Sequence, residues 1–283
     1  QGRILKKQGE TVIDKNGEPV RQPGKLKSVK GIGWYIEEYG VAQISMNLTN
    51  INVTPLHIAF DACVESAQQR GIRVTGSEIV GMVPKRVLVE AGRYFLEKQK
   101  ASAGLSEREL MKLAVKTLGL EEFAPYPLDK KIIEYAIAKP QDSALTDLTV
   151  SGYADLTASE SPAPGGGSAS AAVGAFGTAL GVMVANLTSS KKGYEKHWKM
   201  YSDYAVQGQD IKQRLLRLVD EDTQAYNGII DAVRLPKATD EEIAIRNKAM
   251  VEATRHAIEV PFRAMETAAE AIPLIAAMVE KGN

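Results

Sequence analysis

A hydrophobic repeat over residues 194–233 constrains the fold of this chain more than any other feature of its sequence. Steps of three and four residues place one stripe of side chains along a single face of a helix. The members of the stripe are Tyr204, Gly208, Ile211, Leu215, Val219, Asp222, Tyr226, Ile229 and Val233. A helix of this length with one apolar face needs other helices to cover that face, so the repeat predicts a helical bundle.

Asp222 is the only charged member of this stripe. A carboxylate at a position that the pattern reserves for an apolar side chain loses hydration, which is the environment of many proton-transfer groups in enzymes. A structural ion pair with a lysine or arginine of a neighbouring helix produces the same pattern, and from the pattern alone it is the more common case. Asp220 lies on roughly the opposite side of the helix, so the two aspartates are not expected to share a proton.

A glycine-rich turn precedes another helix, which is expected over residues 168–187. The turn consists of Pro164, Gly165, Gly166, Gly167 and Ser168. Ser168 is a favourable N-cap, and the glycines let backbone N–H groups approach an anionic or oxygen-rich ligand at the positive end of the helix. The alternative is that the glycines only form a tight helix entry. Small residues along this helix predict close packing against another helix, and its Ala and Gly content argues against a membrane span.

A basic cluster separates the two predicted helices. It consists of Lys191, Lys192, Lys196 and Lys199. Most clusters of this kind are solvated, although an acidic substrate tail would find binding partners here. His57 and His256 stand in apolar helical settings without further metal ligands at suitable spacing, so we predict core or boundary histidines and no metal site.

The first half of the chain predicts an α/β lobe in which helices cover one face of a small sheet. Residues 33–48 are strand-like, and residues 41–48 alternate apolar and polar side chains as in a strand with one buried face. Pro55 opens a helix, residues 72–75 form a second strand, and residues 84–99 form a second helix.

Residues 101–150 have the character of a connection, with two short helices and several prolines, and the remainder of the chain is expected to be almost entirely helical. Thr239–Glu242 form a capping box that starts a helix, and Pro261 is expected to kink or restart it. The fold class that follows is α+β with two domains. We predict a small α/β sandwich lobe over residues 1–105, a linker with short helices over residues 106–147, and an all-α up-and-down helical bundle over residues 148–283.

The charge balance and the cysteine content exclude several classes of function. Lysine plus arginine and aspartate plus glutamate each number 35, so no global field attracts nucleic acid or an anionic membrane. Cys63 is the only cysteine, which excludes an intramolecular disulfide framework. The first residues carry basic side chains without the apolar run of a signal peptide, so a cytoplasmic location is expected.

Six segments resemble a known family of enzymes. In the second half, similarity to formimidoyltetrahydrofolate cyclodeaminase lies in Ala163–Ser170, Leu218–Tyr226 and Arg234–Lys237. In the first half, similarity to the C-terminal subdomain of glutamate formimidoyltransferase lies in Gly31–Glu38, Ala42–Leu48 and Gly76–Pro84. The order is that of the bifunctional formimidoyltransferase-cyclodeaminases of histidine degradation, and the resemblance covers essentially the whole chain.

The resemblance implies a folate-dependent enzyme that closes 5-formimidoyltetrahydrofolate to 5,10-methenyltetrahydrofolate with release of ammonia. In the full-length proteins of the family, this follows transfer of the formimidoyl group from formiminoglutamate to tetrahydrofolate. Asp222 matches the second aspartate of the family's Asp-x-Asp pattern, which is treated as catalytic. Tetrahydrofolate is expected as substrate near the glycine turn, with its polyglutamate tail at Lys191 and Lys192. The resemblance also implies a homo-oligomer with the deaminase pocket near a subunit interface.

Two departures from the family pattern bear on activity. The transferase's catalytic histidine belongs to an N-terminal subdomain that this chain is expected to lack, so His57, His197 and His256 do not inherit that role and no transferase activity is expected. The chain also ends before the last helices of family cyclodeaminases, so we expect a fragment. The alternative function is a non-catalytic folate-binding and oligomerisation fragment.

Overall fold

The computed structural model describes residues 2–138 and 145–282. The chain divides into two compact units, and the polypeptide passes between them more than once. The first unit consists of Gln1–Tyr94 and Leu110–Ala136, and the helical unit consists of Phe95–Glu109 and Ile137–Asn283. Small sheets in the first half and helices in the second confirm the predicted α+β class with two domains.

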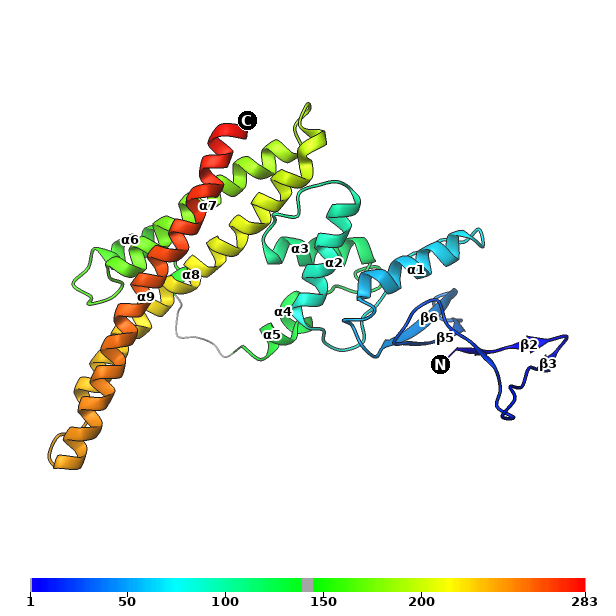
Figure 1. Cartoon of the computed structure of the whole chain (residues 1–283), viewed down its shortest axis with the longest axis horizontal. Helices are drawn as coiled ribbons and strands as arrows, with labels where there is room; N and C mark the ends of the chain where they lie inside the picture. Colours follow the sequence, from blue (N-terminus) through cyan, green and yellow to red (C-terminus); the bar gives the residue numbers. More distant parts are fainter. Residues whose placement is uncertain (1, 139–144, 283) are drawn as a thin grey trace. The chain divides into compact units, whose positions relative to one another are not determined.

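Three long helices form the body of the helical unit, and consecutive helices run in opposite directions as predicted (Figure 1). Their bounds are α7 Gly166–Ser189, α8 Trp198–Arg234 and α9 Asp240–Lys281. The shorter elements are η1 Leu145–Asp147, α6 Val150–Thr157 and η2 Glu195–His197. The predicted capping box of Thr239 and Glu242 starts α9, which continues through Pro261 instead of restarting there. Val260 is fully buried beside that proline, so packing holds the helix together at this point.

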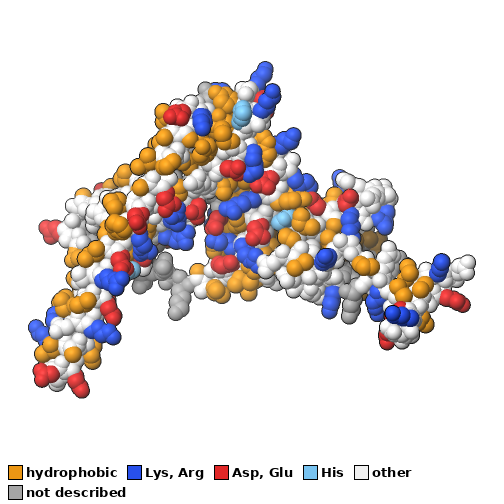
Figure 2. All heavy atoms as spheres, viewed as in Figure 1, with side chains coloured by type: hydrophobic (Ala, Val, Ile, Leu, Met, Phe, Trp, Pro, Cys, Tyr) orange, Lys and Arg blue, Asp and Glu red, His pale blue; other side chains and the backbone are white. Residues whose placement is uncertain are grey.

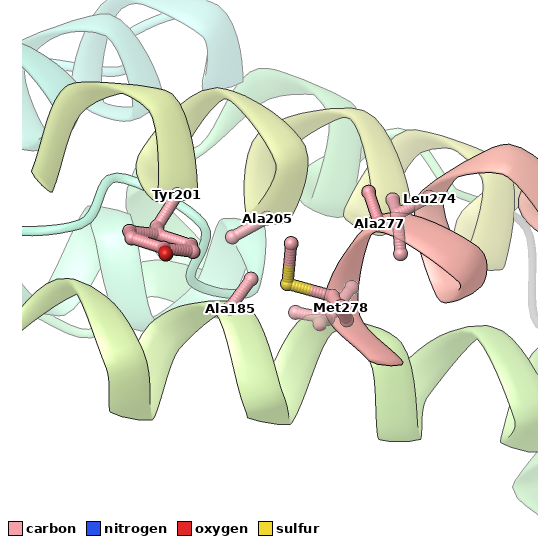
Figure 3. Packing of buried hydrophobic residues seen from close by; sticks show 7 residues of the cluster. Ala185, Tyr201, Ala205, Leu274, Ala277 and Met278 are labelled. Atoms are coloured by element: carbon pink, nitrogen blue, oxygen red, sulfur yellow. The ribbon is translucent and has the colours of Figure 1, made fainter. Parts of the chain in front are cut away.

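Small residues allow α7, α8 and α9 to pack closely. A side chain in place of Gly208 on α8 would put its Cβ 2.4 Å from Val182 of α7, and one in place of Gly181 would put it 2.7 Å from Leu274 of α9. Figure 3 shows the neighbouring core, where Tyr201 and Met278 fill the space that alanines of the facing helices leave. The predicted packing role of the small residues is therefore confirmed.

The apolar stripe of α8 is buried only as far as α7 extends. Ile211 and Leu215 are buried, but Tyr226 and Val233 are 37% and 45% exposed, contrary to the prediction. The first turn of α7 lies opposite Asp222, so beyond this residue α7 no longer covers α8. The prediction assumed that one stripe serves the whole helix, whereas the far part of α8 contributes mainly alanines to its contact with α9.

The length and composition of α7 would allow it to cross a membrane, a test that core helices of soluble proteins also pass. Ser168, Thr178 and Thr188 of this helix are buried. Each of these hydroxyls donates to a backbone carbonyl oxygen, as expected for a helix packed within a protein.

Short elements make up the first unit. Three separate antiparallel pairs of strands replace a single sheet. The strands are β1 Arg3–Ile4 with β4 Arg21–Gln22, β2 Lys6–Lys7 with β3 Glu10–Thr11, and β5 Val29–Ile36 with β6 Val41–Leu48. The helices, of which α2 and α3 cross the division between the units, are α1 Leu56–Gln68, α2 Lys85–Lys98, α3 Glu107–Leu118, α4 Leu128–Lys131 and α5 Ile133–Ala136.

Two expectations for the strands of the first unit are wrong. Residues 72–75 pair with no strand, and Ile72 is 60% exposed, so the segment has no buried face. Residues 33–48 belong to a hairpin whose turn includes Gly40 at φ +63. In β6, Ile44 belongs to the predicted buried face but is exposed, because a two-stranded sheet covered in part by α1 buries little surface.

Candidate active site at the first turn of helix α7

The carboxylate of Asp222 lies against the first turn of α7. Its Oδ2 accepts a hydrogen bond of 2.9 Å from the backbone N–H of Ser168. Gly165 is the N-cap, so Gly166, Gly167 and Ser168 are the first three residues of the helix. Backbone N–H groups at this end have no partner within the helix, and the helix dipole favours negative charge there. Asp222 therefore serves α7 as a cap supplied by another helix.

Gly167 is the glycine that this contact requires. A Cβ atom at this position would lie 2.2 Å from Oδ1 of Asp222 and 2.7 Å from its Cγ. At Gly165 and Gly166, a Cβ atom would have no neighbour within 4 Å. The glycine-rich turn thus contains one position at which a carboxylate touches the backbone and two that are sterically open.

Ser168 is not the N-cap of α7, contrary to the prediction. It is the third residue of the helix and fully buried, and its Oγ donates to the carbonyl oxygen of Val219 at 2.9 Å. Its Oγ also lies 2.8 Å from the hydroxyl of Tyr153 on α6. The helix starts earlier than predicted because Gly165 takes the extended conformation, while Asp222 supplies the acceptor that a serine cap would supply.

The three consecutive carboxylates of α8 bind three different elements. Glu221 forms an ion pair with Arg263 of α9. Asp222 has no lysine or arginine within ion-pair distance among the described residues, so the ion-pair interpretation applies to its neighbour instead. Asp220 accepts hydrogen bonds from the N–H of Leu145 at 2.6 Å and the hydroxyl of Thr146 at 2.9 Å. Asp220 and Asp222 therefore bind different elements, on different sides of α8.

The site offers both an acceptor and donors to a ligand. Within residues 2–138 and 145–282, Oδ1 of Asp222 accepts no hydrogen bond, and the N–H groups of Gly166 and Gly167 donate none. Asp222 is partly exposed, so solvent reaches it. A carboxylate in this setting is suited to bind a cationic N–H group and to accept or return its proton. The adjacent N–H groups are suited to bind a carbonyl or anionic oxygen.

Lys191 and Lys192 lie at the opposite end of α7 from Asp222. Both are exposed, and the helix from Ser168 to its last residue, Ser189, is about 32 Å long at 1.5 Å per residue. Within one chain, the structure therefore does not bring the two predicted parts of the substrate site together. Lys199 is engaged otherwise, since its hydrogen bond to Asp203 raises the pKa of the ammonium group.

Other polar features lie apart from this site. No group of three or more His, Cys, Asp or Glu side chains is placed to hold a metal ion in the described part of the chain. His57 is buried in the first unit and stacks on Tyr94 at 4.4 Å, and burial lowers its pKa. His256 is exposed. A surface pocket on α9, lined by residues such as Met250 and Ile258, does not include Asp222.

Sequence reasoning missed Tyr153 and the burial of Thr223. Thr223 follows Asp222, and its Oγ1 is buried without a hydrogen-bond partner among the described residues. A helical threonine often donates to the carbonyl oxygen four residues earlier. That oxygen belongs to Val219, which here accepts from Ser168.

Two family models match the chain. The formiminotransferase domain matches residues 6–138, and the model described as formiminotransferase-cyclodeaminase matches residues 149–283. Formimidoyltransferase-cyclodeaminase of Mus musculus is 36% identical over 273 residues, which are 96% of this chain and 50% of the relative. The chain thus spans about half the length of the curated bifunctional relatives it matches.

Single-function relatives match the two halves separately. Methenyltetrahydrofolate cyclohydrolase of Methylorubrum extorquens is 36% identical over 135 residues, which are 48% of this chain and 65% of the relative. Glutamate formimidoyltransferase of Thermoplasma acidophilum is 35% identical over 92 residues, which are 32% of this chain and 30% of the relative. With both halves matched in the same order as in the bifunctional relatives, the chain belongs to the formiminotransferase-cyclodeaminase family.

Proposed function

We propose that the helical unit closes 5-formimidoyltetrahydrofolate to 5,10-methenyltetrahydrofolate and releases ammonia, with Asp222 as the proton-transfer group. The observation that carries this proposal is the carboxylate held by one oxygen at the first turn of α7, with its other oxygen available. The names of the relatives favour this enzymatic function over a non-catalytic folate-binding and oligomerisation fragment.

The chemistry needs a group that moves a proton between two nitrogens. N10 of the folate forms a bond to the formimidoyl carbon, and the bond from that carbon to its terminal nitrogen breaks. The proton lost by N10 passes to the departing nitrogen, which leaves as ammonia. Oδ1 of Asp222 is suited to bind the cationic formimidoyl group and then to carry this proton. The first turn of α7 places the positive end of a helix dipole beside this carboxylate.

The test compares Asp222→Asn with the wild-type chain, using 5-formimidoyltetrahydrofolate and following the methenyl product by absorbance. We expect kcat to fall about 10²- to 10⁴-fold, the usual contribution of a positioned proton-transfer group. Asp231→Asn is the matched control, because Asp231 lies on the same helix with a side chain that is 76% exposed. Unchanged kcat in Asp222→Asn would overturn the assignment.

The first unit extends the proposal to a second folate reaction. Residues 6–138 match the formiminotransferase domain, so we propose that the full-length protein also transfers the formimidoyl group from formiminoglutamate to tetrahydrofolate. The product of that transfer is the substrate of the cyclodeaminase. We further propose that the protein is cytoplasmic, with a first domain over residues 1–105, a linker over residues 106–147 and a helical domain over residues 148–283.

Hydrolysis of methenyltetrahydrofolate is a second candidate function, favoured by the cyclohydrolase that matches the helical half. In that reaction water adds to the methenyl carbon, the bond from this carbon to N5 breaks, and 10-formyltetrahydrofolate forms. Asp222 would accept a proton from water and return it to N5. Incubation with methenyltetrahydrofolate in the absence of ammonia separates the two functions, because a cyclohydrolase consumes this compound faster than the uncatalysed reaction does.

The outer faces of α7 and α9 support the proposal of a homo-oligomer. Five apolar side chains of α9 recur at intervals of seven residues and are 61–80% exposed: Val251, Ile258, Met265, Ile272 and Val279. A similar row on α7, 50–71% exposed, consists of Val173, Phe176, Leu180, Met183 and Leu187. Figure 2 shows hydrophobic side chains over much of these helices. Apolar surfaces of this extent are typical of interfaces.

We propose that the deaminase pocket lies near such an interface and that the polyglutamate tail binds Lys191 and Lys192 of a second copy. A copy is needed because the two ends of α7 are far apart within one chain. Leu180→Glu tests the interface by sedimentation, where we expect a smaller species. Lys191→Ala with Lys192→Ala tests the tail, and we expect a higher KM for the polyglutamylated substrate but not for the monoglutamate.

A further inference from the structure

A chain of hydrogen bonds connects α6 to the Asp222 carboxylate. The hydroxyl of Tyr153 lies 2.8 Å from Oγ of Ser168, and the backbone N–H of Ser168 lies 2.9 Å from Oδ2 of Asp222. Ser168 is fully buried, so neither of its polar groups exchanges its partner for water without movement of the helix. Tyr153 thus acts on the same residue that holds Asp222.

The direction of these hydrogen bonds follows from the donors and acceptors present. Oγ of Ser168 donates its single proton to the carbonyl oxygen of Val219, which can only accept. Tyr153 must therefore donate to Ser168. Removing the tyrosine hydroxyl leaves a buried serine oxygen without a donor, and such a group favours a shift that restores a partner. Any shift of Ser168 also moves the N–H that holds Asp222.

Tyr153 is itself held in place by the residues that precede it and by the packing of its ring. Thr149 caps α6 by accepting a hydrogen bond of 3.0 Å from the N–H of Gly152. Asp220 accepts two hydrogen bonds from η1, which precedes this helix. The Tyr153 ring packs against a buried cluster that includes Val219 and Ala171. The hydroxyl is therefore presented to Ser168 by a fixed element.

We infer that Tyr153 is a positioning residue for Asp222. Its hydroxyl fixes Ser168, and Ser168 fixes the carboxylate through Oδ2, which leaves Oδ1 without a hydrogen bond. The inference rests on the proposed function, in which Asp222 moves the proton. The inference gives residues 145–157, which precede α7 in the sequence, a role in positioning the proton-transfer group.

The kinetic test is a double-mutant cycle with Tyr153→Phe and Asp222→Asn in the full chain. Phenylalanine keeps the ring packing and removes the hydroxyl. We expect Tyr153→Phe to lower kcat about 3- to 10-fold with KM changed less than about twofold, and to have almost no effect in the Asp222→Asn background. Tyr204→Phe is the control, because this half-buried tyrosine of α8 has no hydrogen bond to its hydroxyl among the described residues. Equal effects of Tyr153→Phe in both backgrounds would overturn the inference.

Amide hydrogen exchange at Ser168 supplies a readout that does not depend on turnover. We expect the Ser168 N–H to exchange several-fold faster in Tyr153→Phe than in wild type, and at the wild-type rate in Tyr204→Phe. An unchanged rate in Tyr153→Phe would overturn the inference whatever the kinetics. If exchange accelerates as expected while Asp222→Asn leaves turnover unchanged, the coupling of Tyr153 to Asp222 stands and the proposed function fails.

Discussion

In the helical unit, α7, α8 and α9 pack along glycine, alanine and threonine, whereas the first unit consists of short helices and three separate two-stranded sheets. A small-residue seam brings backbones together over many turns, so each helix supports the others. A two-stranded sheet buries little surface, and Ile32, Trp34 and Ile44 are exposed in the longest of them. The contrast teaches that close backbone contact, rather than the amount of regular structure, fixes side chains such as Asp222.

The largest expected effect tests this contact at the site itself. Gly167→Ala should lower kcat/KM at least about 100-fold, because its Cβ would lie 2.2 Å from Oδ1 of Asp222 and displace the carboxylate. Gly228→Ala on α8 is the matched control, since a Cβ there meets nothing within 4 Å and the residue is not part of the proposed site, and we expect less than about threefold change. Steady-state kinetics of methenyl formation provides the measurement. Equal activities of the two variants would show that the contact between Gly167 and Asp222 is not needed for catalysis.

The next effect is expected in the first unit, where α2 crosses α3. Gly92→Ala would place a Cβ 2.2 Å from the carbonyl oxygen of Leu110, and backbone yields little, so we expect destabilisation by about 1–3 kcal/mol. Each unit contains one of the two tryptophans, Trp34 and Trp198. Urea unfolding is followed by Trp34 fluorescence in a Trp198→Phe background, and by Trp198 in Trp34→Phe. If the urea midpoint shifts equally for both tryptophans, the two units unfold together.

The same contrast explains how much of the fold the sequence predicts. Periodicity predicts α8 because one pattern recurs along most of its 37 residues, and the capping box marks the start of α9 correctly. The strand expected at residues 72–75 does not form, because a strand needs a partner and the local pattern does not specify one. The exposure of Tyr226 and Val233 could not be predicted either, because it depends on where the first turn of α7 lies along α8.

The candidate site is predictable only in part, for a related reason. Asp222 stands out as a charge in an apolar stripe, and Gly167 as part of a glycine run. Their contact, and the use of Ser168 as a buried link to Tyr153, arise from tertiary packing that no spacing encodes. The assignment of Lys191 to the same pocket remains a prediction that needs a second copy of the chain.

A smaller effect should appear where a glycine of α7 lies outside the seam and faces open space. Gly177→Ala on α7 meets nothing within 4 Å, so we expect stabilisation of the helical unit by about 0.5–1 kcal/mol from the higher helix propensity of alanine. Gly181→Ala is the contrasting variant, because its Cβ would lie 2.7 Å from Leu274 and should destabilise. Urea midpoints reported by Trp198 decide the question. If both variants are stabilised, the seam is not tightly packed.

The smallest effect is a difference between the units in acid. Burial lowers the pKa of His57 from its ordinary value of 6.5. The negative charges of Glu90 and Asp61 raise it, but burial is the larger effect. As pH falls below 6.5, the unfolded chain binds a proton that native His57 does not, so the first unit loses stability until the native pKa is passed. In the helical unit, the Arg214 hydrogen bond lowers the pKa of Glu270 from 4.5, so that contribution is lost only below about this pH. Urea midpoints between pH 7 and 5.5 should therefore fall for Trp34 and hold for Trp198. His57→Gln should abolish the dependence, and its persistence there would assign it to another group.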